Sequence, residues 1–431
     1  MFQIASISVD GFWDTYSFEL SFEAQTVCFI GQNGTGKTTL VNLIAAALTA
    51  DFRTLDRLPF KRIQIELVSR TEKRRPQVTV YKSSKKGRPY EGIEYRIRSG
   101  VKGDAEAKFS LEEAEEQASL RRYLQSGMHS MYFRRMTTGV LARLNEMVVV
   151  NWLSIHRATL SDRSKEERSY ESSVDQKMES LSNDLIRYIS TLSQQKDTEV
   201  RSFQETMFAS LLEQQGDFEI FDVESLEKID YYSHILHNIF DELHVKEDYS
   251  RKLISSFVER ARAARGEITV ENGIITSLSI DGAIMLIGLR RVEAVVKNWA
   301  ALQDKQRAIF RPVDNFTQIV NQLFSRKTLH ITASNEMSFS SRTGKNLTYH
   351  QLSSGEKQLL ILLSETLLQK EEPAIFIADE PELSLHVLWQ EKLISSIQSL
   401  NPAAQIIVAT HSPDIVGPVH AQIVDMERVI P

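Results

Sequence analysis

Eight consecutive residues early in the chain combine glycines, a lysine and hydroxyl groups at a spacing that suits phosphate binding. They match the pattern G-x-x-x-x-G-K-[ST] at every fixed position and are Gly31, Gln32, Asn33, Gly34, Thr35, Gly36, Lys37 and Thr38. Glycines let the backbone approach an anion closely, and N–H groups at the N-terminus of a helix point towards it. The Lys37 ammonium can reach the β- and γ-phosphates, and the Thr38 hydroxyl can bind Mg²⁺. The pattern therefore predicts an ATP site that includes the following residue, Thr39.

The residues around this loop suit the strand and the helix that must hold it. An apolar, β-prone run, Val27–Ile30, enters the loop, and a second apolar run, Leu40–Leu48, leaves it. A phosphate loop needs a strand before it and a helix after it, so that the helix N-terminus faces the anion. The local sequence thus predicts a strand, a loop and a helix in that order.

Another apolar run ends in two adjacent carboxylates. Residues 374–378 are apolar and β-prone, and Asp379 and Glu380 follow them. Carboxylates at the end of a buried strand are costly unless a cation or protons offset their charge. We therefore expect Asp379 to hold Mg²⁺, directly or through water, and Glu380 to orient or deprotonate the attacking water.

Two further segments carry residues that suit either phosphate chemistry or helix structure. A leucine-rich helix is expected to begin at Ser353, Ser354, Gly355 and Glu356. A hydroxyl, a flexible backbone and a helix N-terminus together form a second phosphate cradle. A helix that is merely capped by a serine, with a glutamate in its first turn, explains part of the same pattern. The other segment, 405–409, is an apolar strand that leads to His411.

Together and in this order, the four motifs resemble those of the ABC-type ATPases of the SMC, RecF and OLD class. The resemblance implies that Ser353–Glu356 is the signature motif, which acts on nucleotide held by a partner subunit, and that His411 senses the γ-phosphate. It also implies slow, Mg²⁺-dependent ATP hydrolysis at composite sites of a homodimer or higher homo-oligomer. The catalytic residues would then be Glu380, Lys37 and His411.

The form Asp-Glu-Pro-Glu after the strand at 374–378 departs from ABC transporters and fits the OLD-like ATPases of bacterial anti-phage systems. The chain resembles the ATPase subunits of two-gene systems, first the AriA type of PARIS and second the PtuA type of Septu. That resemblance implies a sensor or scaffold subunit that controls a separate effector nuclease. A RecF-like DNA-maintenance ATPase is the alternative, and an ATP-dependent scaffold with negligible turnover is a third interpretation.

The expected fold class is α/β, an ABC-type P-loop ATPase head with an antiparallel β lobe and a helical, short coiled-coil-like insertion. Alternating apolar residues predict strands at Phe2–Val9, Ser17–Glu23 and Thr26–Ile30 and an antiparallel sheet within 61–98. A heptad stripe begins at Val174, a second helical run follows Gly216, and a strand pair and a helix that ends near Trp299 follow. The expected domains are the first half of the head, the insertion and the second half of the head, at 1–155, 156–309 and 310–431.

The composition of the 431 residues, 25% charged and 42% hydrophobic, is ordinary for a globular protein without a membrane span. The single cysteine, Cys28, is expected to be a buried hydrophobe, and a cytoplasmic location is expected. The net charge of −6 gives no global attraction to nucleic acid. Residues Lys61–Lys102, however, hold thirteen Lys or Arg against four Glu. This stretch suits DNA or an acidic phage protein, and it equally suits solvated strand faces.

Overall fold

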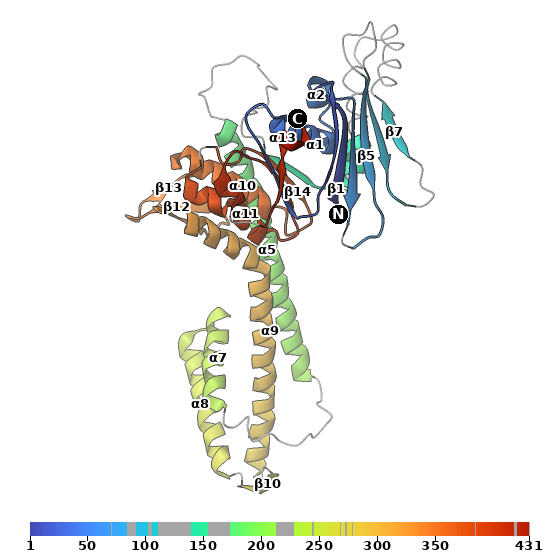
Figure 1. Cartoon of the computed structure of the whole chain (residues 1–431). Helices are drawn as coiled ribbons and strands as arrows, with labels where there is room; N and C mark the ends of the chain where they lie inside the picture. The colour runs from blue at the N-terminus through green and yellow to red at the C-terminus, as the bar shows by residue number, and fades with distance from the viewer. Residues whose placement is uncertain are drawn as a thin grey trace, which may run out of the picture. The chain divides into compact units, whose positions relative to one another are not determined.

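The computed structural model describes most of the chain and divides it into two compact units. The first unit contains residues 1–188 and 312–431, and the second contains 189–311. Figure 1 labels many of the helices and strands of both. The residues described are 1–69, 71–83, 92–101, 106–110, 139–153, 173–212, 228–243, 245–267, 269–271, 274–277, 279–383, 385–417 and 420–430.

A six-stranded antiparallel sheet forms one layer of the first unit. In spatial order its strands are β2 (Tyr16–Ser21), β1 (Gln3–Phe12), β4 (Arg62–Val68), β5 (Gln77–Ser83), β6 (Gly92–Arg98) and β7 (Ala107–Ser110). Buried and partly exposed side chains alternate along β4 and β6, as they do in a sheet with one face on the core. Apolar side chains such as Ile63 and Ile65 therefore face inwards.

A five-stranded parallel sheet carries the predicted ATP motifs. In spatial order its strands are β16 (Gln422–Asp425), β3 (Thr26–Ile30), β15 (Gln405–Ala409), β14 (Ile375–Asp379) and β8 (Val150–Leu153). The central strands are buried along almost their whole length, as expected for a parallel sheet covered on both faces. Cys28 of β3 is buried as expected, and burial, aided by Glu382, raises the pKa of its thiol to about 11.

Helix α1 (Lys37–Thr49) fills the space between the two sheets (Figure 1). Its apolar residues belong to one core cluster with residues of β4, β5, β6, β14 and β15. The buried Tyr95 hydroxyl of β6 donates to the carbonyl oxygens of Ala47 at 3.1 Å and Ala46 at 3.4 Å, near the end of α1. Asp51 caps the short helix α2 (Phe52–Arg57) that follows. The antiparallel sheet therefore fixes the helix that begins at the phosphate loop.

The rest of the first unit surrounds the parallel sheet. Helices α10 (Ser354–Leu367) and α11 (Val387–Leu400) pack against each other (Figure 1). A small antiparallel sheet and a 3₁₀ turn precede α10, with β11 (Lys327–Ile331), β12 (Met337–Ser341), β13 (Asn346–Leu347) and η1 (Tyr349–Gln351). Two short helices follow β15 and β16, namely α12 (Pro413–Val416) and α13 (Met426–Val429).

The described residues of the second unit form parts of four helices and one short hairpin. The elements are α5 (Ser173–Leu212), α7 (Ile229–Glu242), α8 (Glu247–Glu267), β9 (Thr269–Glu271), β10 (Ile274–Ser277) and α9 (Ile280–Leu323). One apolar cluster joins α7, α8 and α9. A second joins α5, α7 and α9 through Phe203, Ile239, Trp299 and Leu302. No helix within the described ranges is both long and apolar enough to cross a membrane.

The structure confirms the predicted α/β fold class with an antiparallel lobe and a helical insertion. The strands predicted in the first thirty residues and within 61–98 are present, with shifts of a few residues at their ends. The predicted helix end near Trp299 is wrong, because α9 continues to Leu323 with Pro312 inside it. Residues 300–310 contain good helix formers and no glycine, so nothing stops the helix there. Helix α7 packs along α8 and also contacts α5 and α9.

The compact units also divide the chain at places other than the predicted domain ends. The divisions fall after residues 188 and 311, and each lies inside a continuous helix, α5 or α9. The predicted insertion of 156–309 begins in a segment outside the described residues. Its exact limits stay a prediction.

Tyr95→Phe tests the contact between the antiparallel sheet and α1. The substitution removes the hydroxyl and leaves the buried carbonyl of Ala47 without that donor, so we expect a loss of about 0.5–1.5 kcal/mol of stability. Urea unfolding should show a lower midpoint with an unchanged slope. The control, Tyr81→Phe, keeps the ring beneath Arg96 and should change stability by less than about 0.5 kcal/mol. Equal losses in both variants would contradict the assignment.

Candidate active site

The phosphate loop joins the buried strand β3 to α1 and depends on its glycines. Gly31, Gly34 and Gly36 have φ values of 140°, 88° and 89°, which glycine adopts at little cost. A Cβ atom at Gly36 would lie 3.0 Å from the ring of Phe12 and 3.1 Å from that of Trp13. Position 36 therefore requires glycine for its backbone conformation and for the space that a side chain would fill.

These two aromatic residues differ in what they offer a ligand. Phe12 is fully buried in the core, whereas Trp13 is half-buried beside Gly36. Trp13 also has a φ of 51°, which is uncommon for a large side chain. Of the two, Trp13 is the better candidate to stack on a base.

Lys37 is held inside the loop in a desolvated position. Its side chain is buried, and Nζ donates to the carbonyl oxygens of Gly31 and Gln32 at 2.8 Å each. Burial lowers the pKa of Lys37, and nearby carboxylates, first Glu380, oppose that shift. An ammonium fixed in this way is ready to pair with a phosphate without a large loss of side-chain entropy.

Thr38 and Asp379 meet although they lie on different elements. The Thr38 hydroxyl donates to Oδ1 of Asp379 at 2.9 Å. Two such oxygen atoms fit Mg²⁺, which usually takes one or two protein ligands and completes its shell with phosphates and water. The described part of the chain offers no group of three His, Cys, Asp or Glu side chains for a metal. When bound, Mg²⁺ neutralises charge on the β- and γ-phosphates.

Glu380 and His411 approach each other at the same edge of the sheet. Oε1 of Glu380 lies 3.8 Å from Nε2 of His411, and the two side chains are 31% and 37% exposed. The Glu380 N–H donates to the carbonyl of Ala409 at 2.8 Å. Glu380 has a φ of 48°, a conformation that costs energy outside glycine and is typical of functional turns. Because both side chains are partly exposed, Glu380 and His411 are accessible to a ligand.

The sequence interpretation gave no role to a third acidic residue, Glu382. Its side chain is buried, and Oε1 accepts hydrogen bonds from the Thr410 hydroxyl and from the N–H groups of His411 and Ser412. The sequence signal that could have indicated a role for Glu382 is its position, because it lies two residues after the proposed catalytic base and between the apolar residues Pro381 and Leu383.

The end of the chain supports the phosphate loop from the side of β16. Oε1 of Glu427 accepts a hydrogen bond from the Gln32 N–H at 3.0 Å. The buried Met426 lies close to Gly31. No sequence motif marks Met426 or Glu427, so these contacts could be found only from the sheet order.

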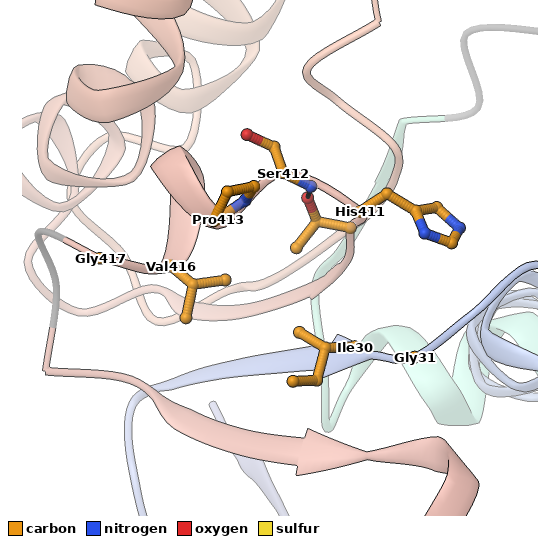
Figure 2. Close-up of a pocket in the computed structure, with 8 residues that line it drawn as sticks. Ile30, Gly31, His411, Ser412, Pro413, Val416 and Gly417 are labelled. Carbon is orange, nitrogen blue, oxygen red and sulfur yellow. Dashed lines mark hydrogen bonds between the residues drawn. The ribbon is translucent and has the colours of Figure 1, made fainter.

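A cavity of about 310 Å³ adjoins the His411 loop (Figure 2). Its walls are Ile30, Gly31, Thr410, His411, Ser412, Pro413, Val416 and Gly417. Figure 2 shows Ile30 and Val416 on opposite sides of the hollow, with the imidazole of His411 turned away from both. The imidazole lies near Glu380 instead, with Nε2 3.8 Å from Oε1 of that residue.

The residues of the predicted signature motif form a capping box at the start of α10. The Glu356 N–H donates to Oγ of Ser353 at 3.3 Å, and the Ser353 N–H donates to Oε2 of Glu356 at 2.7 Å. Lys327 Nζ also donates to Oε2 of Glu356 at 2.7 Å. The helix-capping interpretation is therefore confirmed, while Ser353 and Ser354 remain exposed and the phosphate-cradle role stays a prediction.

Four of the eight Lys and Arg residues described within Lys61–Lys102 form local ion pairs. The ion pairs are Arg62–Asp10, Arg74–Glu72, Arg96–Glu94 and Arg98–Glu106. Lys82 Nζ donates to the carbonyl oxygens of Asp56 and Leu58 at 2.7 Å each. These pairs favour the solvated-face interpretation for the described part of the stretch. Binding of DNA or of an acidic phage protein stays a prediction.

Comparison with protein families places the chain in a class. Residues 183–417 match the family described as "AAA domain, putative AbiEii toxin, Type IV TA system", and residues 6–272 match the family described as "AAA domain". Each match covers more than half of the sequence. The chain belongs to the AAA-domain family of ATPases.

Individual proteins show more limited similarity. "Retron Vc95 probable ATPase" of Vibrio cholerae serotype O1 biovar El Tor is 28% identical over 120 residues. The match spans 25% of this chain and 22% of that relative, which is about a fifth of the relative's length. The Smc head domain of Pyrococcus furiosus, with an extended coiled coil and bound to the C-terminal domain of ScpA, aligns over 100% of this chain and 95% of its own. It has 12% identity and a TM-score of 0.44. The Smc head domain of Pyrococcus yayanosii, with a coiled coil and joint, aligns over 99% of this chain and 95% of its own, with 14% identity and a TM-score of 0.40.

Lys327→Met tests the ion pair beneath the α10 N-terminus. Burial acts to raise the pKa of Glu356, but the Lys327 ammonium and the Ser353 N–H outweigh it and lower that pKa. The stabilisation is therefore complete above the ordinary glutamate pKa and is lost as the pH falls through the lowered value. The variant should lose about 1–3 kcal/mol at pH 7, and the difference from wild type should shrink below about pH 4.

Urea unfolding at several pH values measures this difference. The control is Lys345→Met, which removes an exposed lysine from the same small β region. Its effect should be close to zero at every pH. A loss in Lys327→Met that does not change between pH 7 and pH 3 would show that the ion pair is not its cause.

Proposed function

We propose that this chain binds and hydrolyses ATP with Mg²⁺. The observation that carries the proposal is the meeting of three loops at one edge of the parallel sheet. Thr38 lies 2.9 Å from Asp379, and Glu380 lies 3.8 Å from His411. A hydroxyl, two carboxylates, an imidazole and the Lys37 ammonium are the groups that phosphoryl transfer to water requires.

In the proposed reaction, positioning and charge do most of the work. Lys37 pairs with the β- and γ-phosphates, and Thr38 and Asp379 hold Mg²⁺. Glu380 accepts a proton as the water oxygen bonds to the γ-phosphorus and the bond to the bridging oxygen breaks, which gives ADP and phosphate. His411 donates a hydrogen bond from Nε2 to the γ-phosphate. The short distance between His411 and Glu380 supports action on the same phosphoryl group.

The second half of each site would come from another copy of the chain, in a homodimer or a higher homo-oligomer. Ser353 and Ser354 are exposed at the N-terminus of α10, a 14-residue helix whose end suits an anion. The carboxylate of Glu356 would otherwise repel a phosphate, but Lys327 neutralises it. A phosphate could therefore approach Ser353 without meeting an unpaired negative charge.

For the cellular role, we infer a sensor or scaffold subunit of an anti-phage defence complex that controls a separate effector nuclease. One matching family is described as a putative AbiEii toxin of a type IV TA system, and the similar Vibrio cholerae protein is named Retron Vc95 probable ATPase. We retain the two-gene systems of the PARIS type, and second those of the Septu type, as models for such a subunit. Co-purification with the product of an adjacent gene would support this role. Tight, salt-sensitive DNA binding by the chain alone would instead support a RecF-like function.

Glu380→Gln should trap the nucleotide-bound state. The amide keeps the shape of the side chain but cannot accept the proton, so turnover should fall by roughly a hundredfold or more. ATP should stay with the protein through gel filtration, and the apparent size should increase. The control is Glu391→Gln, an exposed position on α11, which should keep the wild-type rate. Wild-type turnover in Glu380→Gln would remove Glu380 as the base.

A mixing experiment tests the composite site. Lys37→Ala disables the phosphate loop and Ser353→Arg blocks the signature motif, so each variant alone should be inactive. In a mixed dimer one site combines both defects and the other has neither. Equal mixing should restore roughly a quarter of wild-type activity if the sites work independently. Absence of recovery in proven mixed dimers would contradict a site shared between two copies.

A further inference from the structure

Glu382 is a buried carboxylate whose side-chain hydrogen bonds, among the described residues, all run to one loop. Its side chain is 8% exposed. Oε1 accepts from the Thr410 hydroxyl, from the His411 N–H at 3.0 Å and from the Ser412 N–H at 3.3 Å. The Thr410 hydroxyl oxygen in turn accepts from the Ser412 N–H at 2.9 Å. One carboxylate oxygen thus gathers the donors of three consecutive residues.

The second carboxylate oxygen of Glu382 makes the burial of this side chain unfavourable for the stability of the fold. Among the described residues, Oε2 of Glu382 is buried without a hydrogen-bond partner. Burying a carboxylate that lacks a partner for one oxygen costs free energy, and an apolar side chain in the same turn would avoid that cost. The carboxylate is therefore better explained by what it holds in place than by a gain in stability.

The contacts of Glu382 join the two loops that carry the proposed catalytic pair. Glu380 and Glu382 belong to the turn that follows β14, and His411 belongs to the loop that follows β15. The Glu380 N–H donates a hydrogen bond to the carbonyl of Ala409. The Glu382 carboxylate accepts hydrogen bonds from the next three residues, 410–412. Hydrogen bonds from N–H groups to a carboxylate are stronger and shorter than those to neutral acceptors. The two loops therefore form one hydrogen-bonded unit.

We propose that Glu382 is a positioning residue that holds the His411 loop against the Glu380 turn and so sets the distance between the two side chains. This inference rests on the proposed ATPase function. Glu382 itself is buried and acts on the phosphoryl group only through His411. Its role is thus distinct from that of Glu380, two residues earlier.

Glu382→Ala should lower kcat and leave nucleotide binding almost unchanged. A misplacement of about 1 Å in a catalytic group can cost about a hundredfold, so we expect a loss of roughly tenfold to a hundredfold in kcat. The dissociation constant for a fluorescent ATP analogue should stay within about twofold, because the phosphate loop is intact. Glu382→Gln should lose less, since its amide oxygen can accept from the same three donors.

The decisive measurement is a double-mutant cycle with His411→Ala. If Glu382 acts through His411, then Glu382→Ala should cause no further loss of kcat in the His411→Ala background. If Glu382 only stabilises the fold, the two losses should multiply. The matched control is Glu365→Gln on α10, where Glu365 is also 8% exposed and also has a buried, unpartnered Oε2. It should alter stability without changing kcat.

Two outcomes must be kept apart. Absence of ATP hydrolysis in the wild-type protein would overturn the proposed function. Hydrolysis by wild type, with an unchanged kcat in Glu382→Ala or an equal loss in both backgrounds, would overturn only the positioning role. If Glu382→Ala does not fold, the double-mutant cycle with His411→Ala can use Glu382→Gln or Thr410→Val instead. Each of these substitutions weakens the contact between Glu382 and the loop and keeps the volume of the original side chain. Multiplying losses in those variants would likewise overturn the proposal.

Discussion

Parallel pairing of five strands is the constraint on which the rest of the site depends. Because β3, β14 and β15 run in the same direction, the loops that follow them emerge at one edge of the sheet. Residues far apart in the chain then meet, as Thr38 and Asp379 do across 341 positions. An antiparallel arrangement of the same strands would send neighbouring loops to opposite edges. The chemistry proposed above would then be impossible with the same residues.

The antiparallel sheet makes this edge rigid. Helix α1 begins at the phosphate loop and is packed between both sheets, so its N-terminus cannot move without disturbing a large apolar core. The hydroxyl of Tyr95 fixes the other end of the helix. Phe12 and Trp13 close over Gly36 from the same lobe. The antiparallel lobe therefore restrains α1 at both ends, at the phosphate loop and near its C-terminus.

The sequence allowed the site to be predicted better than its supports. Lys37, Asp379 and Glu380 follow apolar runs in patterns that encode local chemistry, so strand, loop and residue type could be inferred together. Glu382 and Glu427 act through distant contacts that depend on which strands are neighbours, and no local pattern records strand order. The capping box at Ser353 shows a third case, in which one pattern serves two physical purposes. The predicted helix end near Trp299 falls too early, because residues 300–310 favour a helix and α9 continues through Pro312 to Leu323.

The position of β3 in the sheet has a consequence for how the protein is made. Both neighbours of β3, namely β15 and β16, come from the last tenth of the chain. The Gln3 side chain of β1 likewise donates a hydrogen bond to the carbonyl of Ala403, 400 residues away. As the ribosome releases the chain, the apolar strand Thr26–Ile30 must wait with both edges open until these partners emerge. Long-range pairing of this kind is slow and exposes strand edges to other chains. The nascent protein therefore passes through a stage in which its phosphate loop exists without the strands that make it work.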